Sequence, residues 1–543
     1  MKSSRWLAGR MGLLSWRATA SLLLLTAAEG LLPAQAPQPE QKAPASAAVT
    51  PDTSPFAMET LRASAERAYG DALGHGAWRI QGKARLHSAD QTYEMIFDDR
   101  NRFLIRTSGA LPQTQAFDGS TYWTLSPSSV AHRVVLLDRD ETRMLAWTIT
   151  GAWTAKHAPV VRTLTTASPG ELDITLKPKD GDVQATLSLD PTTFETKALR
   201  YWTDNGIETW TFTEYRSFSG HKLPTHILHT SGQQKDDITF ASLDKIEATA
   251  ADFRMPKPKV DPTEYDAAAS DRIEVKHIAG LMFVRPKVNG EELGWFFLDT
   301  GADVMCIDPS VVKNQNLPVV GSDDVAGVVG VSHLRICRAG TLQLGPVKIQ
   351  DPIFLELDMA PFAQAFKLPI VGICGYDFLA RASLDIDPKA DSIRIGKPGA
   401  IALPEGAKWT RIRFHANTPC FECAFAANEK GLFSLDTGSN STVDFFSPAV
   451  EKYHLLENRQ TQKAQTGGAG GNAESLTGSI AWFDLGSIRI ENPRVGFQLT
   501  KIGAFSSPYL VGNIGMGFMG KYRLVLDYQN ERVAFVEKVV KQE

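Results

Sequence analysis

In two segments of the chain, an apolar run is followed directly by Asp-Thr-Gly. The first is Gly294–Ala302 (GWFFLDTGA) and the second is Gly431–Ser439 (GLFSLDTGS). Two carboxylates about 3 Å apart cannot both ionise easily, so they share one proton. The ionised partner can take a proton from water, and the protonated partner can hydrogen-bond a carbonyl and later protonate a leaving amine. Asp299 and Asp436 are therefore the candidate catalytic carboxylates.

The two segments belong to a longer internal repeat. Each is followed by a hydrophobic stretch and a proline-containing segment, residues 308–312 in the first copy and 447–450 in the second. Each copy later has a glycine, Gly375 or Gly515, followed at equal spacing by an aspartate. One Asp-Thr-Gly tripeptide would be weak evidence. Two in register predict that the two carboxylates are partners in one site.

Residues 271–537 resemble the aspartic peptidases, and the retropepsin-like branch more closely than pepsin. The family pattern is two hydrophobic residues before Asp-Thr/Ser-Gly-Ala/Ser, and later two hydrophobic residues and a glycine. Phe297–Ala302 and Ile373–Gly375 fit this pattern in the first copy. In the second copy the later element, Asn513–Gly515, is less apolar than the family pattern.

This resemblance implies a mainly β chain that ends in a bilobal pair of β-barrels, residues 271–400 and 401–543. It implies a monomeric, single-chain pseudo-dimer that acts as an aspartic endopeptidase on protein or peptide substrates without a cofactor. Asp299 and Asp436 would activate water across a pseudo-twofold axis. The threonines that follow the aspartates, Thr300 and Thr437, would brace the turns by hydrogen bonds between the lobes. The glycines, Gly301 and Gly438, would allow the two backbones to approach closely.

Glycine clusters in both copies predict flaps that close over a substrate, because glycine allows the backbone mobility that lids require. The candidate flap residues are Gly327 and Gly330 in the first copy and Gly468 and Gly470 in the second. A plain flexible hairpin is the alternative. The less regular second copy also leaves open a catalytically weak or inactive peptide-binding protein.

A separate antiparallel β domain is predicted over residues 57–255, between a Pro/Ala-rich linker at 37–56 and a second linker at 256–270. A helical pattern near 57–73 precedes strands such as Val183–Leu189, in which apolar and polar residues alternate. Its segments QAFDGSTYWTL and ALRYWTDNGIETWTFTEY resemble sequences of the periplasmic lipoprotein-carrier fold. That fold is a curved antiparallel sheet that covers helices. The resemblance implies a bound lipid or lipopeptide; substrate docking and inhibition of the cleft are the alternatives.

Residues 1–36 have the order of a secretory signal peptide. Three arginines precede an apolar stretch at 18–28, and Ala34-Gln35-Ala36 forms an A-x-A cleavage site. We therefore expect an exported protein that is periplasmic or secreted after cleavage.

Composition excludes other classes of function. The formal net charge is −4 over 543 residues, so no basic field would attract nucleic acid. The five cysteines lie in the C-terminal half, and Cys420-x-x-Cys423 has no second such pair or nearby histidine. We expect buried strand cysteines and no metal site.

Overall fold

The structure is a computed structural model that describes residues 25–27, 55–70, 73, 75–168, 171–203, 206–256, 263–328, 330–426 and 429–537. The predicted signal peptide and first linker lie outside the described residues, apart from Leu25–Ala27 and the residues from 55 onward. Leu25–Ala27 (β1) pairs antiparallel with Gln465–Gly467. Residues 257–262 of the second linker are also outside them.

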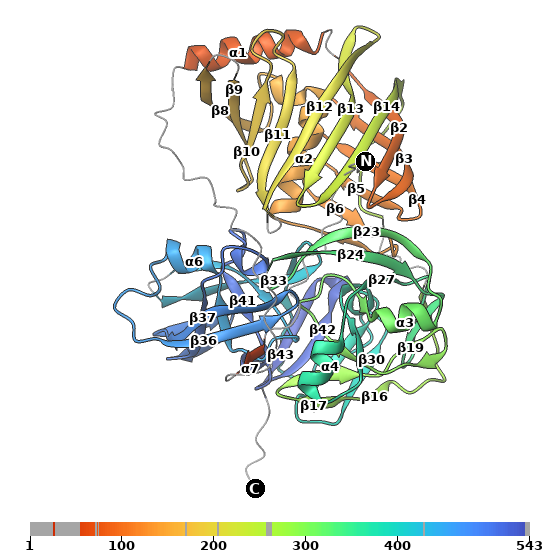
Figure 1. The fold of residues 1–543 in the computed structure, drawn as a ribbon, viewed down its shortest axis with the longest axis vertical. Helices are drawn as coiled ribbons and strands as arrows, with labels where there is room; N and C mark the ends of the chain where they lie inside the picture. The colour runs from red at the N-terminus through yellow and green to blue at the C-terminus, as the bar shows by residue number, and fades with distance from the viewer. Residues whose placement is uncertain are drawn as a thin grey trace, which may run out of the picture.

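The N-terminal half is one curved antiparallel sheet, as predicted, built around α2 (Leu137–Thr150) with α1 (Pro55–Ala68) at one end (Figure 1). Alternation in its strands turns one face toward a core that includes Tyr93, Met144 and Trp210. In sheet order the strands are β7 (Ala131–Arg133), β6 (Tyr122–Leu125), β5 (Gln113–Phe117), β4 (Phe103–Gly109), β3 (Ala89–Asp98), β2 (Ala77–Leu86), β14 (Gln234–Ile246), β13 (His221–Ser231), β12 (Gly206–Phe218), β11 (Thr196–Thr203), β10 (Ala185–Leu189), β9 (Glu171–Pro178) and β8 (Val160–Ser168).

Lobe 1 is built on an eight-stranded sheet. Its central strands are short continuous apolar runs, because both of their faces are covered. In sheet order they are β17 (Lys276–Ile278), β18 (Leu281–Val284), β21 (Trp295–Leu298), β28 (Ile370–Cys374), β22 (Cys306–Ile307), β27 (Ile353–Glu356), β24 (Val331–Arg338) and β23 (Val319–Ala326). A small sheet adds β15 (Thr263–Tyr265), β26 (Val347–Gln350), β25 (Thr341–Leu344), β19 (Lys287–Val288) and β20 (Glu291–Glu292), and the helices are α3 (Pro309–Asn314), α4 (Ala360–Phe366) and α5 (Tyr376–Leu379).

Lobe 2 repeats this plan. In lobe 1, β21 pairs in parallel with β28; in lobe 2, β34 pairs in parallel with β41. Beyond β1, the lobe 2 strands in order are β36 (Gln462–Gly468), β37 (Gly471–Ser479), β40 (Arg494–Gln498), β35 (Val443–Phe445), β41 (Gly512–Ile514), β34 (Glu429–Leu435), β33 (Thr418–Phe425), β38 (Trp482–Leu485) and β39 (Ile488–Glu491), with β32 (Arg413–His415) on β33. Its helices are α6 (Ser447–Lys452) and α7 (Met516–Met519).

A six-stranded sheet joins the two lobes. Strand β29 of the first copy pairs antiparallel with β42 of the second, with Leu384 opposite Leu526. The strands are β16 (Arg272–Glu274), β30 (Ser392–Gly396), β29 (Ser383–Ile386), β42 (Arg523–Asp527), β43 (Arg532–Val536) and β31 (Thr410–Arg411). This shared sheet fixes the two lobes against each other, and the bilobal β architecture is the one that the sequence predicts.

The N-terminal sheet rests on both lobes, with hairpin β23–β24 at the junction (Figure 1). Toward lobe 1, the Ser128 hydroxyl donates a hydrogen bond to the Asp377 carboxylate at 2.7 Å. Toward lobe 2, the Val135 N–H donates to the Phe414 carbonyl at 2.9 Å. The two halves of the chain are therefore in direct contact.

All five cysteines are buried and unpaired, and each lies in a strand, as expected. Within the described part of the chain, no helix is long and apolar enough to cross a membrane.

Candidate active site

Each candidate aspartate follows directly after an apolar strand that pairs in parallel with a second strand. Asp299 follows β21, and its N–H donates to the Cys374 carbonyl of β28 at 3.1 Å. Asp436 follows β34, and its N–H donates to the Ile514 carbonyl of β41 at 2.9 Å. Both side chains are fully buried. The same local pairing thus positions both carboxyl groups.

The two carboxyl groups meet at the lobe interface. A Cβ atom at Gly301 would lie 2.5 Å from Cγ of Asp436, and one at Gly438 would lie 2.4 Å from Oδ2 of Asp299. Each carboxyl group therefore lies against the glycine of the opposite motif, where no larger residue fits. Within each motif the glycine N–H donates to Oδ1 of the aspartate at 2.8 Å.

The threonines form a reciprocal set of hydrogen bonds between the lobes. The Thr300 hydroxyl donates to the Leu435 carbonyl at 2.8 Å, and the Thr437 hydroxyl donates to the Leu298 carbonyl at 2.7 Å. Each hydroxyl also accepts the other threonine's N–H, at 3.0 Å and 2.9 Å. The structure therefore brings Asp299, Thr300 and Gly301 together with Asp436, Thr437 and Gly438.

Burial governs the charge of this pair. It raises the pKa of Asp299 from 3.8 to about 6, against opposing hydrogen bonds from the Gly301 N–H and from Asp436. Burial and then the negative charge of Asp299 raise the pKa of Asp436 well above its usual range. The pair titrates as one unit. Above about pH 6 this arrangement holds one shared proton on the Asp436 side and leaves Asp299 as the ionised partner.

Asn513 is a polar neighbour of the pair that the sequence analysis missed. Its Nδ2 donates to Oδ2 of Asp436 at 3.0 Å. The residue lies in β41, in the segment that is less apolar than the family pattern. The signal was therefore present in the sequence: a buried polar residue one position before Ile514, beside a candidate catalytic strand.

The two glycine clusters form the tips of two hairpins. Gly327 and Gly330 lie at the tip of β23–β24, and Gly468 and Gly470 lie at the tip of β36–β37. A Cβ at Gly327 would lie 2.3 Å from the Ala469 carbonyl oxygen, so the two tips touch. Ala469 also belongs to the buried cluster that contains Ala302, the residue after the first Asp-Thr-Gly. The hairpin tips thus meet in a closed arrangement at the lobe interface.

No group of three or more histidine, cysteine, aspartate or glutamate side chains in the described ranges could hold a metal ion. The site described here consists of two carboxyl groups, backbone donors and neutral side chains.

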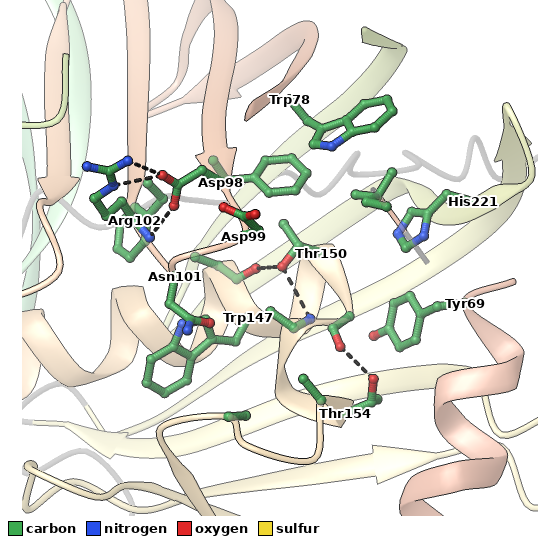
Figure 2. A pocket seen from close by; sticks show the side chains of 18 of the residues that line it. Tyr69, Trp78, Asp98, Asp99, Asn101, Arg102, Trp147, Thr150, Thr154 and His221 are labelled. Carbon is green, nitrogen blue, oxygen red and sulfur yellow. Dashed lines mark hydrogen bonds and ion pairs between the residues drawn. The ribbon is translucent and has the colours of Figure 1, made fainter. Parts of the chain in front are cut away.

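A second candidate site is a cavity of about 350 Å³ in the N-terminal half. Its lining is mainly apolar and includes Trp78 from the sheet and Trp147 from α2, with Asp98 and Arg102 paired at one side (Figure 2). Tyr69 also lies at the cavity, and its hydroxyl donates to the Thr148 carbonyl at 2.6 Å. The cavity suits an apolar ligand with a polar end.

Comparisons with known proteins give a family match and similar solved structures. Residues 284–378, which include Asp299, match the aspartyl protease family. A LolA-superfamily protein from Nitrosomonas europaea is 13% identical with a TM-score of 0.27, over 36% of this chain and 96% of that chain. A DUF1329-family protein from Desulfovibrio piger is 9% identical with a TM-score of 0.27, over 37% and 96%. The search of curated proteins found no match.

Proposed function

We propose that the chain is an exported aspartic endopeptidase that hydrolyses peptide bonds through one shared pair of carboxyl groups. The observation that carries the proposal is the reciprocal placement of each aspartate against the glycine of the other motif. The match of residues 284–378 to the aspartyl protease family supports it for lobe 1. The parallel strand pairing at Asp436 extends the same local structure to lobe 2.

The chemistry follows from the two different environments of the carboxyl groups. Asp299, the more acidic partner, takes a proton from a water molecule as it attacks the scissile carbonyl. Asp436 holds the shared proton, donates a hydrogen bond to the developing oxyanion and later transfers a proton to the leaving amine. The closed flap tips exclude bulk water and strengthen these electrostatic interactions.

Cleavage profiling with a peptide library and an unfolded protein tests this proposal. We expect cleavage by the wild type and none by Asp299→Asn or Asp436→Asn. Asp391→Asn, an exposed substitution in lobe 1, is the matched control and should cleave like the wild type. A chain that binds a transition-state-mimicking peptide yet cleaves nothing from acid to neutral pH would instead be a peptide-binding protein.

Export is proposed from the sequence of residues 1–36. The arginines, the apolar stretch and Ala34-Gln35-Ala36 support it. Cell fractionation and N-terminal sequencing of the purified chain test it, and we expect the mature chain to begin after residue 36. A chain that keeps residue 1 in the cytoplasmic fraction would contradict export.

A second function is proposed for the N-terminal half, which we infer binds a lipid or lipopeptide. The cavity of about 350 Å³ between the sheet and α2 supports it, because its mainly apolar lining suits an acyl chain. Mass spectrometry of the native-purified chain should detect acyl chains. Trp147→Arg, which places a charge in the cavity, should remove them, and their absence from the wild type would contradict the proposal.

A further inference from the structure

The groove beside the paired aspartates differs between the two lobes. On the lobe 2 side, a cavity of about 650 Å³ lies between residues 440–442, the flap hairpin β36–β37 and β40. Residues 440–442 begin two positions after the second Asp-Thr-Gly, so this cavity borders the loop that follows Asp436. Its lining is polar as well as apolar and includes Lys463, Glu474 and Arg494.

The same place in lobe 1 is bounded by residues 303–305, the flap hairpin β23–β24 and β27. Residues 303–305 are related to 440–442 by the offset that relates Asp299 to Asp436. Here the side chain of Leu111, from the loop between β4 and β5, is 1% exposed. It belongs to the buried cluster that contains Val304, Val325 and Ile336. A residue of the N-terminal half thus fills the counterpart of the open lobe 2 cavity.

Further contacts fix the N-terminal half to the lobe 1 flap. The Ser322 N–H donates to the His87 carbonyl at 2.9 Å. The Asp324 carboxylate accepts the N–H groups of Gln233 at 2.8 Å and Gln234 at 3.1 Å. Arg338 donates to the Ala110 carbonyl at 2.7 Å, next to Leu111. These bonds come from three separate loops. They hold β23 at Ser322 and Asp324, and β24 at its last residue, Arg338.

The N-terminal half reaches the loop that borders this end of the groove through lobe 2, because Asn417 of lobe 2 contacts that loop and the adjacent Ala416 contacts the N-terminal half. Asn417 donates to the Asp303 carbonyl at 2.8 Å, just after the first Asp-Thr-Gly. The adjacent Ala416 N–H donates to the Asp138 carboxylate at 2.9 Å. Because these contacts hold both lobes, the N-terminal half is a fixed wall and not a detachable plug.

From this asymmetry we infer that the substrate groove is closed at its lobe 1 end by Leu111 and its loop, so that the enzyme cuts bonds near one end of a peptide. The inference rests on the proposed peptidase function and narrows it. A substrate extends on the lobe 2 side, where the cavity is open, and only a few residues fit on the lobe 1 side. Among the described residues, the N-terminal sheet makes no such bonds to the lobe 2 flap. Only Leu25–Ala27, which precede the predicted cleavage site, pair with its strand β36, so in the mature chain this flap admits the substrate.

An extension series tests the inference. One cleavable peptide is lengthened stepwise at its N-terminus in one set and at its C-terminus in the other, and cut positions are read by mass spectrometry. We expect lengthening at one terminus to slow cleavage about tenfold or more, because the added residues must displace the buried Leu111 side chain. Lengthening at the other terminus should leave the rate unchanged.

Two variants distinguish a specific effect of Leu111 and its loop from a general loss of structure. Leu111→Ala should restore cleavage of the lengthened peptides. Arg338→Ala, which releases the carbonyls of Ala110 and Asp351, should also restore it. Leu172→Ala in β9, toward the other edge of the N-terminal sheet, and Arg394→Ala in β30 are the controls and should not. If Leu111→Ala fails to fold, restored cleavage of the lengthened peptides by Arg338→Ala alone supports the closed groove.

Three other outcomes are informative. Cleavage that depends on both aspartates but is insensitive to length at either terminus would overturn the closed groove and leave the peptidase function intact. Cleavage by Leu111→Ala but none by the wild type would also overturn it, because the wall would then shut the whole site. No cleavage by any variant would count against the proposed function itself.

Discussion

Asn513 donates a hydrogen bond to Asp436 at 3.0 Å, whereas the matching strand position in lobe 1 is the apolar Ile373. The pair of carboxyl groups is therefore not symmetric, although the backbone around it is. The extra donor favours the ionised form of Asp436 and opposes the effect of burial on its pKa. The two carboxyl groups consequently have different supports in an otherwise repeated fold.

Substitution of Asn513 should change the pH dependence of cleavage. Asn513→Leu removes a donor that stabilises ionised Asp436, so the pKa of Asp436 rises and the shared proton is retained to higher pH. The basic limb of the kcat/KM profile should move upward by about one pH unit. Asn314→Leu, at an exposed position in α3, is the control. A basic limb that stays in place or moves down would show that this bond does not tune the pair.

The threonine bonds should contribute to stability as well as to geometry. Thr437→Val keeps the shape of the side chain but leaves the Leu298 carbonyl and the Thr300 N–H without their partner. We expect a loss of about 2–4 kcal/mol in the free energy of unfolding, since each buried unsatisfied group costs about 1–3 kcal/mol. Thr437→Ser retains the hydroxyl and should lose much less. Equal denaturation midpoints for the two variants would contradict this role.

The raised pKa of Asp299 has a consequence for stability against pH. Its folded-state pKa of about 6 exceeds its ordinary 3.8, so the folded state binds the proton more tightly than the unfolded state. The stability contribution is complete below about pH 4 and is lost as pH rises to about 6, at about 1.4 kcal/mol per pH unit. Asp299→Asn should therefore lose less stability than the wild type between these values. The measurement is the free energy of unfolding of both proteins, from chemical denaturation at each pH. If the two curves of stability against pH run parallel, this prediction is wrong.

Contact between the flap tips should matter for substrate binding. Gly327→Ala places a Cβ 2.3 Å from the Ala469 carbonyl oxygen, so the closed arrangement must shift. We expect KM to rise and the fold to remain stable, because the change lies at a hairpin tip. Gly396→Ala in β30, where a Cβ would make ordinary contacts, is the matched control. An unchanged KM would favour a plain hairpin over a flap.

Much of the architecture is predictable because it follows from local patterns and repetition. The two Asp-Thr-Gly motifs, in register with Gly375 and Gly515, predict both lobes and the meeting of Asp299 with Asp436. The alternation in strands such as β10 predicts the N-terminal sheet. In each case the information lies within one element or in the spacing of two copies of it.

The contacts between the halves of the chain could not be predicted in the same way. Leu111 lies in the short loop between β4 and β5, and its neighbours Ala110 and Pro112 do not indicate that it is buried in one cluster with Val325 and Ile336. Asp324 lies in strand β23 of lobe 1 and Gln233 in the turn between β13 and β14, far apart in the sequence. Such contacts depend on how folded domains pack against each other, so no periodicity or motif in the sequence predicts them. For Asn513, the sequence indicates an unusual polar residue in an apolar segment, but it does not indicate that the side chain binds Asp436.

Kinetics of the two single variants and the double variant test the central claim most directly. If Asp299 and Asp436 form one site, Asp299→Asn and Asp436→Asn should each reduce kcat as much as the double variant does, because groups that act as a unit are strongly non-additive. One peptide substrate with a single cleaved bond suffices for the measurement. Single variants that each keep a substantial share of the wild-type rate, with the remainder lost only in the double variant, would show two separate sites and contradict the account.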